Sequence, residues 1–146
     1  MAHGDSGGKG LRQLLGRLEH HGVEVDDSPR RRSEYSYDAS NYRARPAAVA
    51  FPNCVEDVRT VLRACSALGV PLTARGGGTS MAGNAIGNGL VMDLSRHMKS
   101  IGTLDAEKDA IWVDAGVVLG ELRTHIEQAT AGTLTFAPDP SSLTRA

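Results

Sequence analysis

The stretch that decides the fold is TARGGGTSMAGNAIGNGLVMDLS, residues 73–95. It contains six glycines between positions 76 and 89, three of them consecutive, followed by an apolar run that leads to Asp93. Glycine loses more conformational freedom on folding than any other residue, so this loop is costly unless its bare backbone is needed. We therefore expect residues 76–89 to bring main-chain N–H groups close to a ligand.

The side chains of this stretch suit an anion better than a bond-cleaving centre. Consecutive glycines let N–H groups converge on an anion in a nest, and a Cβ at Gly77 is expected to disturb it. Thr79 and Ser80 add hydroxyl donors, and Arg75 adds a cation. No nucleophile with a base beside it lies in the loop, so the sequence predicts that the loop holds a phosphate. The alternative is a glycine-rich turn without a ligand.

Two well-known phosphate-binding loops are excluded by the residues that their mechanisms require. A P-loop needs Lys and then Ser or Thr after its second glycine, whereas Asn84 and Ala85 follow Gly83. A dinucleotide fingerprint needs a third glycine three residues after Gly78, where Met81 stands. The loop is therefore of neither type.

Periodicity on both sides of the loop predicts a mixed α and β domain. Helical stripes are expected over 9–21, from Val55 to Gly69 with an Asn53–Glu56 capping box, and over 118–128. Strands are expected at 47–51, 70–74, 90–94, 110–116 with Ile111, Val113 and Ala115 inward, and 133–136. The segment from Asp26 to Ser40 is polar and turn-prone. The alternation of strand, helix and strand, with a hairpin-like pair, indicates an α+β or α/β fold.

Composition excludes several classes of function. The net charge of −1 and the aromatic content of 4% argue against a nucleic-acid partner. No apolar run reaches the length of a membrane helix, and no secretory signal is visible. Cys54 and Cys65 lie too far apart on one predicted helix for a disulfide, and no metal-ligand cluster accompanies them. Reduced thiols of this kind lead us to expect a cytoplasmic protein without a metal site.

None of the other polar residues is assigned a catalytic role. Those weighed are His20, His21, His97 and His125, the basic run Arg30 to Arg32, and Asp93. The histidines are expected on the surface, with His20 and His21 favoured by the C-terminal helix dipole. We expect the arginines to be solvated and Asp93 to cap a turn. The catalytic residues therefore remain unknown.

Four motifs, in order and closely spaced, carry a resemblance to a known family. They are P-x-x-V/A-x-x-P before a helix that begins with Glu56 and Asp57; V-P-L-T-x-R-G-G-G-T-S-x-x-G; L-V-M-D-L-S-R; and F-x-P-D-P-S-S near the end. From about Tyr35 onward, the chain resembles flavoenzymes of the vanillyl-alcohol oxidase type. It is most similar to their D-lactate, glycolate and D-2-hydroxyglutarate dehydrogenase branch.

The resemblance implies an α+β, two-lobed FAD-binding domain of the vanillyl-alcohol oxidase type, with FAD between the lobes. Residues 1–34 are then a leader and amphipathic helix, and residues 35–146 the N-terminal part of the domain, with the first lobe and part of the second present. The cofactor-binding residues that it implies are Arg75, Gly76, Gly77, Gly78, Thr79, Ser80, Gly83 and Asn84 around the pyrophosphate, and Pro138, Asp139 and Ser142 near the flavin. Some relatives attach FAD through a histidine in this loop. Gly78 or Thr79 stands at that place, so we expect non-covalent FAD.

The function implied is that of an FAD-dependent oxidoreductase that takes a hydride from a small 2-hydroxy acid and passes electrons to a separate acceptor. The family's chain continues past the P-D-P segment. We therefore expect this chain to be a fragment that is inactive alone, binds FAD weakly and self-associates through exposed apolar surface. The rival hypothesis is a non-catalytic nucleotide- or phosphate-binding module that regulates a partner. A reductase of cell-wall precursor synthesis is disfavoured by the R-G-G-G-T-S and P-D-P pair.

Overall fold

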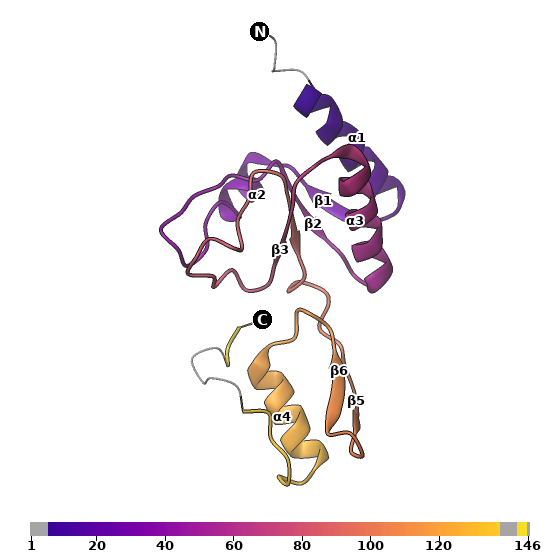
Figure 1. The fold of residues 1–146 in the computed structure, drawn as a ribbon, viewed down its shortest axis with the longest axis vertical. Helices are drawn as coiled ribbons and strands as arrows, with labels where there is room; N and C mark the ends of the chain where they lie inside the picture. The colour runs from indigo at the N-terminus through magenta and orange to yellow at the C-terminus, as the bar shows by residue number, and fades with distance from the viewer. Residues whose placement is uncertain (1–5, 138–142, 146) are drawn as a thin grey trace.

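The computed structural model describes residues 6–137 and 143–145, which form an α+β structure in two lobes (Figure 1). The first lobe contains α1 (Ser6–His20), β1 (Glu24–Asp26), α2 (Pro29–Glu34), β2 (Ala48–Phe51), α3 (Val55–Leu68), β3 (Leu72–Arg75) and β4 (Leu90–Asp93). The second contains β5 (Ile101–Asp105), β6 (Ala110–Val113) and α4 (Leu119–Ala129). The mixed fold expected from the sequence is confirmed.

The sheet of the first lobe has the strand order β1-β2-β4-β3. Strand β4 runs parallel to both of its neighbours, β2 and β3, and β1 pairs with β2 in the antiparallel direction. Every residue of β2 and β4 is buried, as expected for central strands of a sheet that is covered on both faces. The glycine-rich stretch at residues 76–89, here called the glycine loop, joins β3, an edge strand of this sheet, to its neighbour β4.

Helices α1 and α3 cover one face of the sheet. Leu14 and Leu18 of α1 pack in one buried cluster with Val61 of α3 and with Ala48 and Ala50 of β2. Figure 1 shows α1 and α3 side by side over the strands. On the opposite face of the sheet, a smaller cluster of β2 and β4 side chains packs against Tyr35. Helix α1 is therefore an integral part of the core of the first lobe.

Helix α3 begins and ends close to the predicted residues, but its first turn is capped differently. Gly69 ends the helix in the left-handed conformation, with φ of 64°. The expected Asn53–Glu56 capping box is wrong. The N–H of Asn53 donates instead to Oδ2 of Asp57 at 2.8 Å, and Glu56 forms an ion pair with Arg59. Cys54 is the exposed N-cap residue and Cys65 is buried, and both thiols are free, as predicted.

The polar segment that we expected to be a turn begins at Asp26, the last residue of β1, and contains α2. Ser28 caps α2 by accepting a hydrogen bond from the N–H of Arg31 at 3.3 Å. Arg31 also forms ion pairs with Asp26 and Glu34, which hold the strand and the helix together. The basic run lies on a helix rather than in a turn: Arg31 is half-buried and ion-paired, whereas the side chain of Arg30 is exposed to solvent, as expected.

The second lobe is a two-stranded hairpin with one helix. A turn at residues 106–109 joins β5 to β6, and the helix expected over 118–128 is confirmed as α4. The expected inward position of Val113 is wrong, because its exposed fraction is 39% and the pairing register shifts between Ile101 and Leu104. The strand expected at residues 133–136 is also absent. Leu134 instead packs against the α4 cluster, and its N–H donates to Oγ1 of Thr130.

None of the helices in the described part of the chain is long and apolar enough to cross a membrane.

The packing of α1 gives a first testable prediction. Leu18→Ala should lower the free energy of unfolding by about 2–5 kcal/mol, because the side chain is fully buried between α1, α3 and the sheet. Leu62→Ala on the exposed side of α3 is the matched control and should cost about 0.5 kcal/mol or less. Urea denaturation followed by circular dichroism measures both. Equal midpoints for the two variants would exclude α1 from this core.

Candidate functional site

The glycine loop leaves β3 at Arg75 and returns to the sheet at Leu90. Gly78 and Gly83 have the left-handed backbone conformation, with φ of 70° and 80°. Gly77, where we expected a Cβ to disturb the loop, is not among the residues with positive φ. Only glycine adopts this conformation without strain, so both positions need a residue without a Cβ.

Main-chain donors in the first half of the loop are available to a ligand. Within the described ranges, residues 6–137 and 143–145, no hydrogen bond from the N–H groups of residues 76–81 is formed to another protein atom. Ser80 closes the following turn, because its Oγ accepts hydrogen bonds from the N–H groups of Ala82 and Asn84. Gly77 and Thr79 are exposed. Unpaired N–H groups beside a left-handed glycine are a feature that anion-binding nests share.

A second segment, which the sequence did not single out, forms a wall beside the loop. We call residues 35–42 the tyrosine segment, since Tyr35, Tyr37 and Tyr42 lie in it. A Cβ built on Gly83 would lie 3.0 Å from Cδ2 of Tyr42. The two segments are therefore in direct contact, although about forty residues separate them along the chain.

Asp38 of the tyrosine segment is a buried carboxylate that binds the loop directly. Its Oδ2 accepts a hydrogen bond from the N–H of Ala85 at 3.3 Å, and its Oδ1 accepts one from the N–H of Ser40 at 2.9 Å. The hydrogen bond from the Ser40 hydroxyl is the main cause that lowers the pKa of Asp38. The carboxylate therefore stays charged at neutral pH and keeps both segments joined.

Arg75 points into the protein between these segments. Its Nη1 donates to the carbonyl oxygen of Tyr37 at 2.8 Å and to that of Ala85 at 3.2 Å. Tyr35 lies beneath it and donates its hydroxyl hydrogen to Asp93 at the end of β4. Burial, with a further contribution from this hydrogen bond, raises the pKa of Tyr35, so its hydroxyl remains a donor. Asp93 caps the turn after β4, as expected, by accepting two hydrogen bonds from Ser95.

The remaining candidates are placed as follows. Asn84 is exposed next to Gly83, and its N–H is bound by Ser80. Pro138, Asp139 and Ser142 lie outside the described residues. His20, His21 and His125 are exposed, and His97 lies 3.3 Å from Glu24, so these four histidines are on the surface, as expected. No group of His, Cys, Asp or Glu in the described part of the chain could hold a metal ion.

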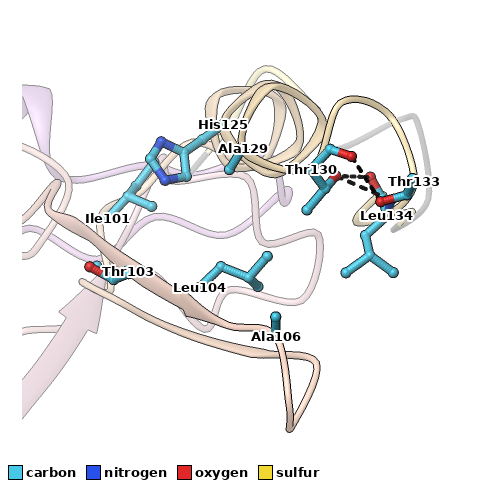
Figure 2. Close-up of a pocket in the computed structure, with 10 residues that line it drawn as sticks. Ile101, Thr103, Leu104, Ala106, His125, Ala129, Thr130, Thr133 and Leu134 are labelled. Carbon is cyan, nitrogen blue, oxygen red and sulfur yellow. Dashed lines mark hydrogen bonds between the residues drawn. The ribbon is translucent and has the colours of Figure 1, made fainter.

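A separate hollow lies between β5 and α4 in the second lobe. Its volume is about 720 Å³, and Ile101, Leu104, His125, Thr130 and Leu134 are among the residues that line it (Figure 2). Among the described residues of its wall, His125 is the one titratable side chain. A hollow lined mainly by apolar and hydroxyl groups does not suit a polyanion, so the glycine loop is the better anion site.

The geometry of the site agrees with a match to a known family. The FAD binding domain family matches residues 46–146, a range that includes α3, the glycine loop and the second lobe. The chain therefore belongs to the FAD binding domain family. The loop fits the cofactor of this family, because FAD carries a pyrophosphate and the accessible N–H groups of residues 76–81 can donate to its oxygens.

Curated relatives come from one group of enzymes. The chain is 34% identical over 138 residues to D-2-hydroxyglutarate dehydrogenase of Escherichia coli strain K12, and the match covers 91% of the chain and 13% of that enzyme. It is 32% identical over 134 residues to the glycolate oxidase subunit GlcD of the same strain, covering 88% of the chain and 26% of the relative. The chain thus spans a small part of the length of the relatives it matches.

Solved structures share the fold. A TM-score of 0.74 relates the chain to alkyldihydroxyacetonephosphate synthase at 17% identity, over 90% of this chain and 27% of that one. For 4-ethylphenol oxidase from Gulosibacter chungangensis the TM-score is 0.70 at 18% identity, and the match covers 89% of this chain and 26% of that one. The fold is therefore that of the vanillyl-alcohol oxidase type of FAD-binding domain, represented by the first lobe and part of the second.

The nest geometry gives a second prediction. Gly78→Ala should weaken FAD binding far more than Thr79→Ala, because a Cβ at Gly78 disfavours its φ of 70°, collides with the Arg75 side chain and so displaces several N–H groups together. Thr79→Ala removes at most one hydrogen bond, worth about tenfold in affinity or less. FAD titration of the full-length protein measures both dissociation constants.

A matched control separates the nest from general damage. Gly16→Ala makes the same chemical change on α1, where a Cβ meets nothing within 4 Å, and should leave FAD affinity unchanged. Equal small losses for Gly78→Ala and Thr79→Ala would mean that the glycines serve the turn and not the ligand.

Proposed function

We propose that this chain is the N-terminal part of an FAD-dependent oxidoreductase, and that the glycine loop binds the pyrophosphate of FAD. The observation that carries this proposal is the run of accessible N–H groups at residues 76–81 in a chain of the FAD binding domain family. A neutral nest can hold two phosphate groups without a lysine, which fits the absence of Lys from the loop.

The residues of the site bind and orient rather than react. Bound FAD supplies a hydride acceptor for the substrate carbon that carries the hydroxyl group. Thr79 and Ser80 can donate their hydroxyl hydrogens to phosphate oxygens, and Gly83 lets the loop turn back against Tyr42. Asn84 extends this wall, and Pro138, Asp139 and Ser142 are proposed to face the flavin. No described residue is assigned as the base that takes the hydroxyl proton.

A small 2-hydroxy acid is the substrate that we propose for the whole protein, with a separate electron acceptor. Support comes from relatives named D-2-hydroxyglutarate dehydrogenase, glycolate oxidase subunit GlcD and D-lactate dehydrogenase. The family match disfavours the rival hypothesis of a regulatory phosphate-binding module. We also infer a cytoplasmic location, because the two free thiols suit a reducing compartment.

The mode of FAD attachment gives a third prediction. The flavin of the full-length protein should be released into solution by acid precipitation, because Gly78 and Thr79 stand where some relatives carry the attaching histidine. Visible absorbance of the supernatant and the pellet measures the release. Yellow colour that stays with the precipitated protein would contradict non-covalent binding.

The substrate class gives a fourth prediction. Anaerobic addition of D-2-hydroxyglutarate, D-lactate or glycolate should bleach the visible flavin band of the full-length protein, because reduction of the flavin removes this absorbance. The corresponding 2-oxo acids carry no hydride to donate and are the matched controls. A flavin that no 2-hydroxy acid bleaches would overturn the substrate class but leave FAD binding intact.

A further inference from the structure

Arg75 occupies the last position of β3, directly before the glycine loop. We propose that Arg75 is a positioning residue: its guanidinium, stacked on Tyr35 and bonded to Tyr37 and Ala85, sets the shape of the loop that receives FAD. Its effect on FAD binding then comes from loop geometry, and not from its charge acting on phosphate. This inference rests on the FAD-binding part of the proposed function.

The guanidinium joins three parts of the chain. Nη1 donates to the carbonyl oxygens of Tyr37, in the tyrosine segment, and Ala85, in the second half of the glycine loop. The carbon Cζ lies 4.9 Å from the centroid of the Tyr35 ring, within the range of a cation–π interaction. One side chain therefore fixes the distance between the tyrosine segment and the loop.

Gly78 packs directly on this guanidinium. A Cβ built on Gly78 would collide with Nη2 of Arg75 and would lie 2.7 Å from its Cζ. The left-handed turn at Gly78 thus places the loop directly against the guanidinium of Arg75, and no space is left for a side chain between the two residues. The position of Arg75 consequently sets where the N–H groups before and after Gly78 can point.

The ring under Arg75 is itself anchored. Tyr35 donates its hydroxyl hydrogen to Oδ2 of Asp93, a buried carboxylate with an exposed fraction of 6%. Asp93 is paired in register with Arg75 across the neighbouring strands β4 and β3. The stack of Arg75 on Tyr35 is therefore fixed by the sheet at both ends.

Ala85 is held on both sides of its main chain. Its carbonyl oxygen accepts from Arg75, and its N–H donates to the buried carboxylate of Asp38. Asp38 also binds Ser40 within the tyrosine segment. Ala85 is thus linked to the tyrosine segment in two independent ways, directly through Asp38 and indirectly through Arg75. The guanidinium of Arg75 also contacts Gly78.

Lysine cannot reproduce this arrangement, because it lacks the planar fork that can stack on a ring while bonding two carbonyl groups. Lysine keeps the positive charge, however. The pair Arg75→Lys and Arg75→Met therefore separates the two roles: charge on phosphate is retained by Lys and lost by Met, whereas loop positioning is lost by both.

The test is titration of the flavin-free, full-length protein with FAD and with riboflavin, which lacks the pyrophosphate. Arg75→Lys and Arg75→Met should both weaken FAD binding by at least about tenfold, since one hydrogen bond to a charged group is worth roughly that factor. Riboflavin affinity should stay at the wild-type value. A general loss of structure would lower the affinity for both ligands, so the ratio of the two constants reports on the loop.

Two further variants sharpen the result. Tyr35→Phe removes only the hydroxyl that anchors the ring to Asp93, and should weaken FAD binding by less than Arg75→Lys. Combined with Arg75→Lys, it should cost less than the sum of the single losses, because both act on one stack. Arg59→Lys on the exposed face of α3 is the matched control and should change nothing.

Three outcomes would overturn the proposal. They are wild-type FAD affinity in Arg75→Lys, a weaker dependence of FAD affinity on salt in Arg75→Met than in the wild type, and equal losses for FAD and riboflavin. The first two assign the effect to charge on phosphate. Failure of the wild-type protein to bind FAD would instead overturn the proposed function itself.

Discussion

The connection between β3 and β4 is the constraint on which the site depends. The two strands are parallel neighbours, so the chain must return from the end of one to the start of the other. A helix usually makes such a crossing and uses its own N–H groups internally. Here residues 76–89 make it as a glycine-rich loop, and the N–H groups of its first half are not used by the described residues. The route of the chain thus creates the donors that an anion needs.

A loop without its own hydrogen-bond ladder has to be shaped by its surroundings. The first lobe supplies that shape through the tyrosine segment: the carbonyl oxygen of Tyr37 accepts from Arg75, and the carboxylate of Asp38 accepts from the N–H of Ala85. The segment is in turn tied to the sheet, because Tyr35 packs on Val49, Phe51 and Val91 and binds Asp93. Core packing and the proposed cofactor site are therefore continuous, because the sheet that buries the apolar residues also anchors the segment beside the glycine loop.

Much of the first lobe could be predicted from the sequence, because its signals are local. The run at β2, the helical stripe of α3 and the glycine at its end each depend on neighbouring residues. β1 was missed because it is a three-residue polar strand, and its partner β2 lies more than twenty residues later. Residues 133–136 have the composition of a strand, but β propensity is expressed only beside a pairing partner. Here Leu134 packs on the buried side chains of α4 instead.

The glycine loop could be singled out from the sequence, but its surroundings could not, for a similar reason. Six glycines and Arg75 predict an anion loop from composition alone. The partners of Arg75, however, are a ring and a carbonyl about forty residues earlier in the chain, which no spacing rule connects to the loop. The position of the left-handed glycine follows from the same contacts, since Gly78 lies against the guanidinium. Whether the cation of Arg75 binds phosphate or positions the loop can therefore be argued only from three-dimensional geometry.

Hydrogen–deuterium exchange at the amides of residues 76–81 tests the central claim most directly. In the flavin-free, full-length protein these amides should exchange rapidly, because the described residues offer them no acceptor. FAD at saturating concentration should slow their exchange, and riboflavin, which lacks the pyrophosphate, should not. Exchange at residues 76–81 that stays equally fast with FAD bound would contradict the account, since the pyrophosphate would then lie elsewhere.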